Sequence, residues 1–546
     1  MRGSVRRSLR TRTVILVGLA VFVGLTLALG LHVSRASADT SQPSGPDRVA
    51  AVYVDYTSYE WWMVSWKDNQ IACAFYTDHD GLPTDNDIYT GCGETLYDKW
   101  AATAPCENIQ AGGSTSSCPG YYLNYIKSSP SRRKIGVTLP PAVVWLTLEG
   151  CTPSSSTNYC LEQPILVLTG NEPLPNESIS SIAGALNGEA FTCEATCELT
   201  MPVTGEDSIE LDFWANSSYG DSSPAYQAQV RVAEFETEAG THYWYVDVLS
   251  SQWTGNPTAG CAQIWGAFPP VGGPPAWLST PKNAEDLASN IPYDYLAGHL
   301  IRQGAVDVSN CTDDGLLASG GASTCGQEAA RPAVEDWQNS FDDTILKAAN
   351  DAGIPAQLLK NLFSRESQFW PGMINRVTEV GLGQLTDNGA DTALLWNPSF
   401  YEQFCPLVLA DSVCRKGYPQ LQPNEQAMLR GALVSSADAY CANCPLGLDL
   451  RQADFSVSVF AETLQANCGQ VAQLIHNYLW ISPGQVSSYE DLWKFTLVNY
   501  NAGSGCLSLA IEGTIDIGEE LNWENLSQHL TPVCEGAKDY VEDISQ

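Results

Sequence analysis

The chain has 546 residues, enough for about three to four domains of ~150 residues each. Its 62 Asp and Glu outnumber its 27 Lys and Arg, giving a net charge of −35, which argues against nucleic acid and anionic membrane surfaces as partners because phosphate contacts need cations. Only 16% of the residues are charged, and eighteen cysteines, an even number, predict a disulfide framework in an oxidising compartment.

Residues 1–38 are predicted to be a signal peptide or an uncleaved N-terminal anchor. Five arginines precede the apolar run 14–31, and Ala36-Ser37-Ala38 offers a small-residue cleavage site. Both alternatives stay open, because the run is long for a signal core and borderline for a spanning helix. In either case we expect an extracytoplasmic protein, secreted or associated with the cell envelope, that meets a membrane only through this segment. Removing residues 1–38 would leave 21 basic and 62 acidic side chains.

Residues 50–268 are rich in Tyr, Trp, Val and Thr, and Gly, Pro, Asn and Asp interrupt them at short intervals, which is typical of strands and turns. Residues 50–160 form a β-rich region without a clear topology, which is either a separate small domain or part of one larger β unit. Residues 161–268 are a candidate immunoglobulin-like sandwich, since apolar and polar residues alternate in 208–214, 227–233 and 243–248.

An acidic turn within the first β-rich region is a candidate calcium site. Its carboxylates are the oxygen ligands that calcium prefers, although the turn lacks the acid that opens an EF-hand loop, and a plain acidic turn is the alternative. The carboxylates belong to Asp78, Asp80, Asp85 and Asp87. Elsewhere the sequence contains no HExxH, GxSxG or phosphate-binding loop, so we expect no other metal or cofactor.

The Pro-rich run 269–275 begins a linker that we place at 269–332 and that contains Cys311 and Cys325. Nine cysteines lie before this linker and seven after it. These odd counts predict a bridge from each side to the linker, or a free thiol. The pair Cys441 and Cys444 could bind zinc or act in redox chemistry, but no further ligands stand at finger spacing, and a structural disulfide is the better interpretation.

Helical patterns dominate residues 333–546, with candidate helices at 334–352, from Pro355 onward, and at 424–439, 457–480 and 489–498. Glu366 shares the apolar face of the second of these helices with Leu358 and Leu362. Burial among apolar side chains raises the pKa of a carboxyl group, which is the condition for a general acid that keeps its proton near neutral pH.

Three motifs follow in order: Glu-Ser-Gln-Phe at 366–369, Gly-Leu-Gly-Gln at 381–384 and Tyr-Asn-Ala-Gly at 500–503. Together they resemble the motifs of lytic transglycosylases, the soluble peptidoglycan-cleaving branch of the lysozyme superfamily, in which Glu-Ser-x-Phe-x-Pro precedes Gly-Leu-Met-Gln and then Tyr-Asn-Ala-Gly. Pro371 also matches. The resemblance covers residues 335–530 and does not extend to the β-rich half.

The resemblance implies a role for each matched residue. Glu366 would protonate the oxygen between N-acetylmuramic acid and N-acetylglucosamine, and would then accept the proton of the sugar's C6 hydroxyl, so that a 1,6-anhydro ring closes. One carboxyl group suffices, whereas retaining and inverting glycosidases need two. Ser367 would orient the acid, Gln384 would line the sugar groove, Tyr500 would bring its hydroxyl near the acid, and Asn501 would anchor the helix end or bind a saccharide amide.

Two departures from the family pattern keep the outcome of the reaction open. Gly383 stands where the family has Met, and Thr378-Glu379 where it has Gly-Ala. If Glu379 reached the reaction centre, it would position a water molecule and turn the reaction into hydrolysis. The alternative is a solvated loop acid.

The matched residues also have purely structural explanations. Glu366 would then pair with Arg365 or Arg376 at the helix surface, Gln384 would belong to a tight turn, and Tyr500 would be an ordinary half-buried tyrosine.

The sequence therefore predicts an exported protein whose β-rich N-terminal half presents or anchors a mainly α, lysozyme-like domain to peptidoglycan glycan strands. The expected activity is that of a lytic transglycosylase. A hydrolytic muramidase is the alternative enzyme, and a non-catalytic cell-wall or carbohydrate-binding surface protein is the alternative without chemistry.

Overall fold

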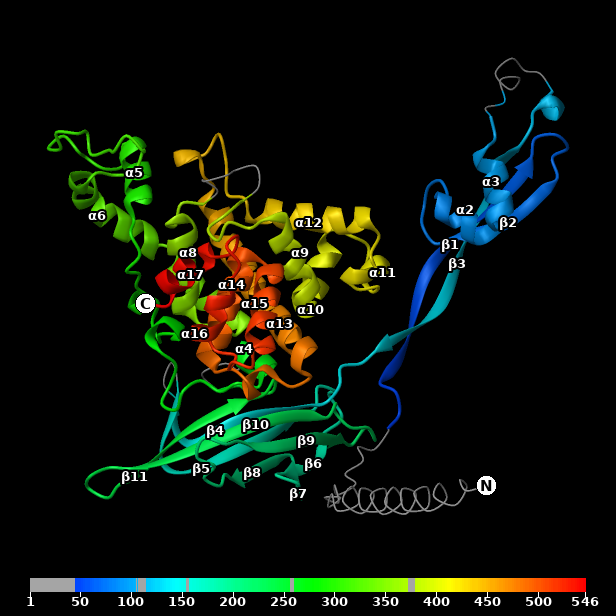
Figure 1. The fold of residues 1–546 in the computed structure, drawn as a ribbon. Helices are drawn as coiled ribbons and strands as arrows, with labels where there is room; N and C mark the ends of the chain where they lie inside the picture. The colour runs from blue at the N-terminus through cyan, green and yellow to red at the C-terminus, as the bar shows by residue number, and fades with distance from the viewer. Residues whose placement is uncertain (1–44, 105, 107–113, 154–156, 256–259, 372–378) are drawn as a thin grey trace, which may run out of the picture. The chain divides into compact units, whose positions relative to one another are not determined.

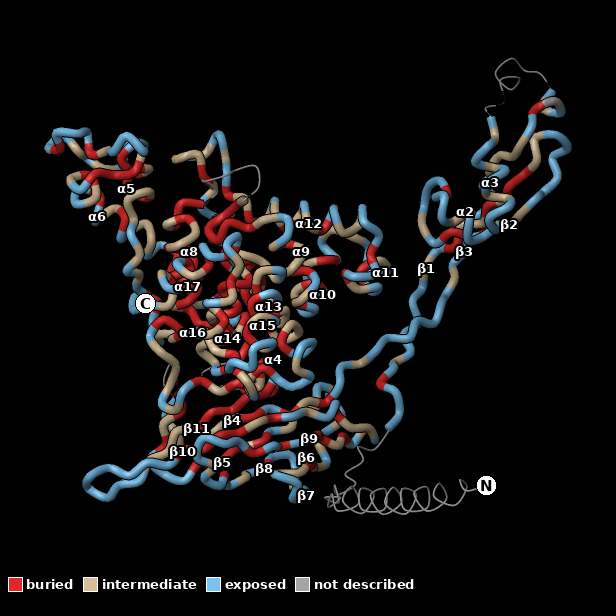
Figure 2. Tube along the Cα trace, viewed as in Figure 1, coloured by how far each residue is buried: buried red, intermediate tan, exposed pale blue. Residues whose placement is uncertain are grey.

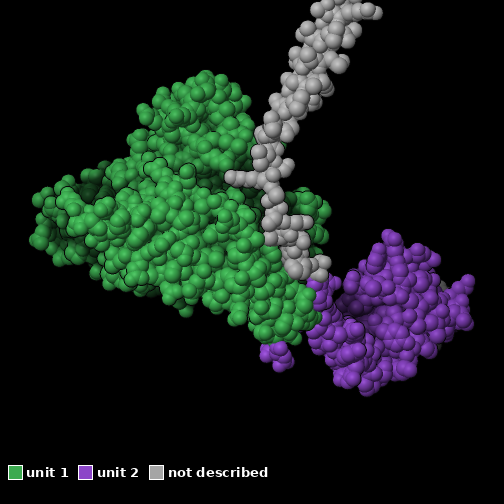
Figure 3. All heavy atoms as spheres, turned by 90° about the horizontal axis from the view of Figure 1, so that it is seen from below, with its two compact units in different colours: residues 1–44, 142–172, 177–546 green, residues 45–141, 173–176 purple. Residues whose placement is uncertain are grey.

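The computed structural model in Figure 1 describes residues 45–104, 106, 114–153, 157–255, 260–371 and 379–546. These residues form two compact units, a smaller one of 45–141 with 173–176 and a larger one of 142–172 with 177–546 (Figure 3). The segment 1–38, predicted as signal peptide or anchor, lies outside the described residues. Within the described ranges, no helix has the length and apolar character that a membrane span requires.

The smaller unit is a three-stranded antiparallel sheet with two short helices on it. The strands are β1 (Val49–Ser65), β2 (Ile71–Thr77) and β3 (Tyr121–Thr138), in the order β2-β1-β3. The helices are α2 (Asp85–Cys92) and α3 (Glu94–Ala101), followed by the 3-10 turn η2 (Thr115–Ser117). A small core is formed by Trp61, Met63, Phe75 and Ile88. Two disulfides, Cys73–Cys92 and Cys106–Cys118, supplement this core.

The acidic turn of this unit serves mainly to start helix α2. The Asp87 carboxylate accepts hydrogen bonds from Thr84 and lies 2.8 Å from His79 Nε2, completing a capping box at the helix N-terminus. Asp78 pairs with Arg133 at 3.0 Å. No group of three or more His, Cys, Asp and Glu side chains converges in the part of the chain that the structure describes. The calcium expectation for Asp78, Asp80, Asp85 and Asp87 thus gains no support.

The larger unit begins with one antiparallel sheet of eight strands. The strand order is β4-β5-β11-β10-β9-β6-β7, and β8 pairs with β5. The strands are β4 (Val143–Pro153), β5 (Asn158–Asn171), β6 (Ile179–Leu186), β7 (Glu189–Cys193), β8 (Thr196–Thr200), β9 (Ile209–Ser217), β10 (Tyr226–Glu236) and β11 (His242–Leu249). The predicted alternation is present in β9, where Ile209, Leu211 and Phe213 are buried.

The sheet begins earlier in the sequence than the predicted sandwich of residues 161–268, because its first strand starts at Val143. The pattern assigned β4 and the start of β5 to a separate region before residue 161, but β4 pairs with β5, and β5 pairs with β11. These partners are distant in the sequence, so periodicity alone does not reveal them. Strands β4 to β11 are thus joined in one hydrogen-bonded sheet.

The rest of the larger unit is helical (Figure 1). Its helices before the motif loop are α4 (Gly260–Trp265), α5 (Asp294–Arg302), α6 (Thr324–Asn339), α7 (Asp342–Ala352) and α8 (Ala356–Ser367). Those after it are α9 (Asp387–Trp396), α10 (Pro398–Phe404), α11 (Asp411–Cys414), α12 (Pro423–Ala437), α13 (Leu450–Leu479), α14 (Tyr489–Ala502), α15 (Ser504–Asp516), α16 (Trp523–Leu526) and α17 (Gly536–Ile544). Short 3-10 turns lie at Ala276–Leu278, Ala284–Asp286, Cys405–Leu407, Tyr418–Gln420, Pro445–Gly447, Pro483–Gln485 and Ser527–His529.

Two predicted segments differ from the observed helices. The single helix expected at 334–352 is the end of α6 followed by α7, although Gly353 ends it as expected, in the left-handed conformation. The segment 269–332, predicted as a linker, contains α5 and the first half of α6, and α5 packs on α6 around a small core of its own. Short helices of this kind are stabilised by tertiary packing, which a Gly- and Pro-rich composition conceals.

Helix α13 lies at the centre of the helical core and packs against α7, α9, α12 and α14. The buried residues in Figure 2 concentrate around it. Because α13 has thirty residues and neighbours on several sides, it forms the rigid wall on which the candidate site is built.

All eighteen cysteines are paired, which fits an extracytoplasmic protein. The expectation that each side would bridge to the linker was wrong, because Cys311 pairs with Cys325 and Cys261 bridges directly to Cys468 on α13. Cys441–Cys444 is a disulfide, as the sequence favoured. The other bridges of the larger unit are Cys151–Cys160, Cys193–Cys197, Cys405–Cys414 and Cys506–Cys534.

Candidate functional site

Glu366 lies in the last turn of α8, at the end of the predicted apolar stripe. Leu358 and Leu362 on that stripe are fully buried, and Glu366 is partly buried. The helix stops directly after the acid because Gln368 and Phe369 both have positive φ angles, 49° and 62°. This conformation costs free energy in residues other than glycine, so neighbouring contacts must hold it.

Two contacts fix the end of α8. The Gln368 side-chain oxygen accepts hydrogen bonds from the backbone N–H groups of Tyr295 and Leu296 at the start of α5, and the Trp337 indole N–H donates to the Phe369 carbonyl at 2.8 Å. Helices α5 and α6, which begin in the predicted linker, therefore hold the backbone just beyond Glu366 in place.

The electrostatic environment of Glu366 favours a protonated carboxyl group. Desolvation by burial raises its pKa from 4.5 to about 7, and the negative charge of Glu379 adds to this, whereas a hydrogen bond from Tyr540 and the charge of Arg365 oppose it. The Tyr540 hydroxyl donates to Glu366 Oε1 at 2.5 Å. Arg365 instead forms its ion pair with Asp543, at 2.8 Å, so it does not neutralise the acid directly.

A cleft of 500 Å³ opens beside this carboxyl group. Eleven of its lining side chains are neutral and polar, two are acidic and none is basic, as far as the described residues line it. The polar ones are Gln384, Thr386, Asn388, Thr392, Thr463, Asn467, Gln470, Asn499, Tyr500, Asn501 and Ser504. Neutral hydroxyl and amide groups suit an uncharged ligand rich in hydroxyl and amide groups better than an anion or a hydrocarbon.

The loop 380–385 brings the second motif to the acid. Ser367, which is buried, donates to the Leu382 carbonyl at 2.7 Å, and Tyr500 donates to the Gly383 carbonyl at 2.6 Å. Both predicted residues thus hold the backbone of the loop rather than bonding to Glu366. Gln384 is part of a tight turn, with φ of 53°, and it also lines the cleft.

The structure gives a reason for the glycine at 383, where the family pattern has Met. A Cβ atom at this position would stand 2.4 Å from the ring of Phe460 and 2.8 Å from the Tyr500 hydroxyl. Phe460 is fully buried on α13 and fills the space that a larger side chain at 383 would need.

Tyr500 lines the same cleft as Glu366, and its pKa is raised well above its usual value by burial and by the negative charge of the acid. It therefore stays protonated. Asn501 is exposed on the rim of the cleft, in the last turn of α14 before Gly503. The three motifs thus meet at one cleft.

Glu379 lines the cleft together with Glu366. It is the second acid among the described lining residues, and its negative charge contributes to the raised pKa of Glu366. The sequence analysis left a choice between a loop acid in solvent and a second acid of the site. In the structure Glu379 is a lining residue of the cleft that contains Glu366.

Sequence reasoning missed one partner of the acid and one group of cleft residues. Tyr540, on the last helix, follows Glu366 by 174 positions, and no pattern around it points to the acid. Asn499, Asn467 and Gln470 form the cleft wall. Asn499 carried a weak signal, because it stands next to the third motif and follows the apolar residues Leu497 and Val498.

The chain matches no protein-family model, and comparisons with curated proteins and with solved structures found no match. The case for a function therefore rests on the chemistry of this cleft and on the three motifs.

Proposed function

We propose that this protein is an exported peptidoglycan-cleaving enzyme of the lytic transglycosylase type, with a lysozyme-like arrangement of its helical domain. The observation that carries the proposal is Glu366, a carboxyl group whose pKa is raised to about 7 and which opens onto a cleft of neutral polar side chains. An acid of this kind holds a proton at the pH at which it must donate it.

The two carboxyl oxygens of Glu366 have different surroundings. Oε1 accepts the hydrogen bond from Tyr540, and no other described group bonds to the carboxyl, so Oε2 is the oxygen that carries the transferable proton. It would pass that proton to the bridging oxygen as the glycosidic bond breaks. The resulting carboxylate, stabilised by the Tyr540 hydroxyl, would then take the proton of the sugar's C6 hydroxyl as that oxygen closes the 1,6-anhydro ring.

The neutral lining of the cleft supports a saccharide as the ligand. Hydroxyl and acetamido groups exchange hydrogen bonds with Asn, Gln and Thr side chains without a charged partner. The acidic surface of the chain also disfavours an anionic polymer held by its phosphates. Glycan strands of peptidoglycan fit both observations.

A hydrolytic muramidase is the second candidate, because Glu379 lines the same cleft. A second carboxylate in the cleft would hold and deprotonate a water molecule, and the product would then be a reducing end. The single-carboxyl mechanism needs no such water.

The experiment that tests the proposal is digestion of purified sacculi followed by mass spectrometry of the released muropeptides. The wild-type chain should release 1,6-anhydro ends, and Glu366→Gln should release nothing while unfolding at an unreduced temperature. Undiminished release by a folded Glu366→Gln variant refutes the assignment. Glu379→Gln is the matched control: unchanged anhydro products favour the transglycosylase, and loss of reducing ends favours the muramidase.

A non-catalytic wall-binding protein is the third candidate, and binding of glycan strands without any released product would identify it. In each case we assign the β-rich half the task of presenting or anchoring the helical domain at the cell wall. An immunoglobulin-like character for residues 161–268 rests only on the strand alternation, and belongs to this proposal.

A further inference from the structure

A second cavity, of 540 Å³, shares no lining residue with the cleft of Glu366. It is formed by the end of α9, by α10 and α11, and by the two 3-10 turns that flank α11. Seven of the twelve described lining residues are Leu, Pro or Tyr. The volume lies in the range of small-molecule sites, and an apolar cavity with a few polar groups is the usual form of such a site.

Two buried tyrosines give this cavity apolar walls. The Tyr401 hydroxyl donates to the Cys414 carbonyl at 3.0 Å, and the Tyr418 hydroxyl donates to the carboxylate of Asp391, which also accepts from Arg430. The two tyrosines are 4% and 6% exposed. Because their polar atoms already have partners, these residues offer ring surface to a ligand, which suits an aliphatic or aromatic group.

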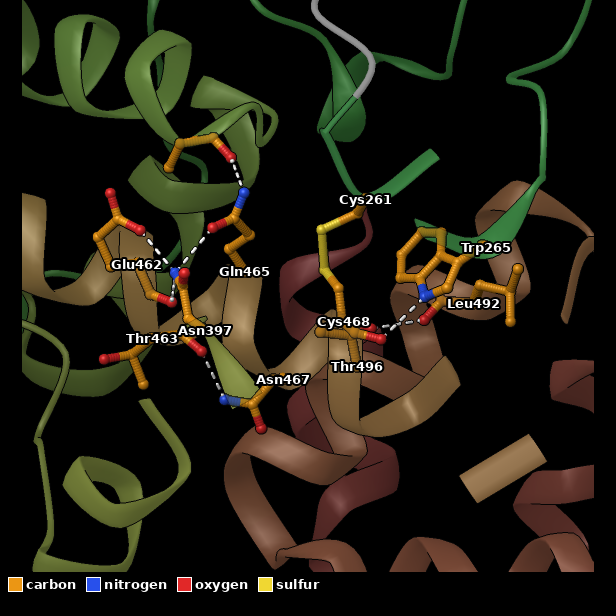
Figure 4. The surroundings of a disulfide bond; sticks show 11 residues. Cys261, Trp265, Asn397, Glu462, Thr463, Gln465, Asn467, Cys468, Leu492 and Thr496 are labelled. Carbon is orange, nitrogen blue, oxygen red and sulfur yellow. Dashed lines mark hydrogen bonds between the residues drawn. A yellow bond between two sulfur atoms is a disulfide. The ribbon is translucent and has the colours of Figure 1, made fainter. Parts of the chain in front are cut away.

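The walls of the cavity are fixed before any ligand arrives. The disulfide Cys405–Cys414 joins the turn after α10 to α11. At the corner between α9 and α10, Asn397 donates to the side chains of Glu462 and Gln465 on α13, at 2.6 and 2.7 Å (Figure 4). A preformed cavity lowers the cost of ordering that binding would otherwise carry.

Three charged residues line the cavity, and all three are exposed: Glu402, Asp411 and Arg415. Asp411 and Arg415 stand four positions apart on and just after α11, a spacing at which opposite charges can pair. Within the described ranges, however, none of the three belongs to an ion pair, whereas neighbouring charges do pair. The cavity therefore offers one cation and two carboxylates beside its apolar walls.

Helix α9 lines both the cleft and this cavity. Thr392 lines the cleft, and Leu395 lines the cavity. Three helical positions correspond to about 4.5 Å along the axis. Residues at this spacing lie on neighbouring parts of the helix surface. A ligand in the cavity would thus contact the helix that also forms a wall of the cleft.

We propose that this cavity binds a short, free apolar peptide. The apolar side chains of the peptide lie against Tyr401 and Leu395, its carboxylate end pairs with Arg415, and its ammonium end pairs with Glu402 or Asp411. One cation against two carboxylates disfavours an anion, and the apolar walls disfavour a sugar. The cavity is thus a second binding site, whose ligand differs in chemistry from that of the cleft.

The test measures binding of dipeptides to the full exported chain by ligand-observed NMR titration. Leucyl-leucine should bind at least about tenfold more tightly than glycyl-glycine, because its side chains bury apolar surface. It should bind at least about fivefold more tightly than N-acetyl-leucyl-leucine amide, which has no charged end. Absence of saturable leucyl-leucine binding overturns the proposal, and so does equal affinity for either comparison peptide.

A peptide attached to a larger molecule through its amino end is the other source of this chemistry. N-acetyl-leucyl-leucine, which keeps only the carboxylate, represents it. This dipeptide should bind more weakly than leucyl-leucine, since it cannot pair with Glu402 or Asp411. Equally tight binding contradicts the assignment to a free peptide.

Substitutions at exposed positions locate the site. Arg415→Gln should weaken leucyl-leucine binding by about fivefold and leave the doubly blocked dipeptide within about twofold. Arg451→Gln makes the same change at an exposed position of α13 outside both cavities and should alter neither. Equal effects of the two substitutions place the peptide elsewhere and refute the proposal.

The apolar wall has its own matched pair. Leu395→Asn should weaken both leucyl-leucine and its doubly blocked form, whereas Leu509→Asn, at an exposed position of α15, should weaken neither. Unchanged binding by Leu395→Asn contradicts the proposal. None of these measurements uses cleavage, so their result is independent of whether the cleft is that of an enzyme.

Discussion

Replacing Glu366 by Gln should make the helical domain more stable at neutral pH while abolishing cleavage. The physical reason is that the folded chain holds this carboxyl group with its pKa raised from 4.5 to about 7. Below pH 4.5 the group is protonated in both the folded and the unfolded state, and its burial carries no ionisation penalty. As the pH rises through 7, the unfolded state releases the proton first, so the folded state loses stability.

The magnitude follows from the size of the shift. A difference of about 2.5 pKa units, at 1.36 kcal/mol per unit, amounts to about 3 kcal/mol of folding free energy lost between pH 4.5 and pH 7.5. Glutamine does not ionise, so the variant avoids this loss. Each kcal/mol moves the melting temperature by about 2–4 °C in a domain of 150–250 residues, so the melting temperatures of variant and wild type should diverge by about 6 °C or more.

The assay is thermal unfolding by calorimetry at pH 4.5, 6 and 7.5. Glu542→Gln is the matched control, because it makes the same change at an exposed position of α17 and should give no divergence with pH. A stability difference between wild type and Glu366→Gln that is constant from pH 4.5 to pH 7.5 refutes the raised pKa, and with it the reasoning that makes this residue the general acid.

Three further perturbations test other parts of the structure. Tyr540→Phe removes the hydrogen bond that favours the Glu366 carboxylate, so the pH above which cleavage falls should move upward in a pH–rate profile, and an unmoved profile speaks against this contact. Cys261→Ala with Cys468→Ala opens a 207-residue loop and should cost up to about 5 kcal/mol in the chain-entropy model, seen as a lower melting temperature. Gly383→Met should destabilise the fold by about 1–3 kcal/mol through overpacking, and an unchanged melting temperature contradicts the crowding described at this position.

Two of the predicted site residues form hydrogen bonds with a different partner from the one expected. Ser367 and Tyr500 were expected to orient or accompany the acid, and they instead bond to the backbone of the loop 380–385. Their shared task is to fix Gln384 and the cleft wall relative to Glu366. The direct partner of the acid is Tyr540, so substitutions at Tyr500 and Tyr540 should have separable effects, on loop position and on the pKa of the acid.

The sequence by itself determined the local features of this protein. The apolar stripe placed Glu366 on the buried face of a helix, Gly353 marked the end of α7, and the alternation of residues 208–214 marked strand β9, because these signals depend on neighbours a few positions away. The eighteen cysteines also indicated an oxidising compartment, because their number is known without any structure.

Only the tertiary structure decided what depends on distant contacts. It brought Tyr540 to the acid, paired Cys261 with Cys468, joined β4 to the sheet, and buried the Asn499 side-chain carbonyl without a hydrogen-bond partner among the described residues. The pKa of Glu366 belongs to this group as well. Desolvation depends on every segment that packs around the carboxyl group. One of these segments is α17, whose Tyr540 follows Glu366 by 174 positions in the sequence.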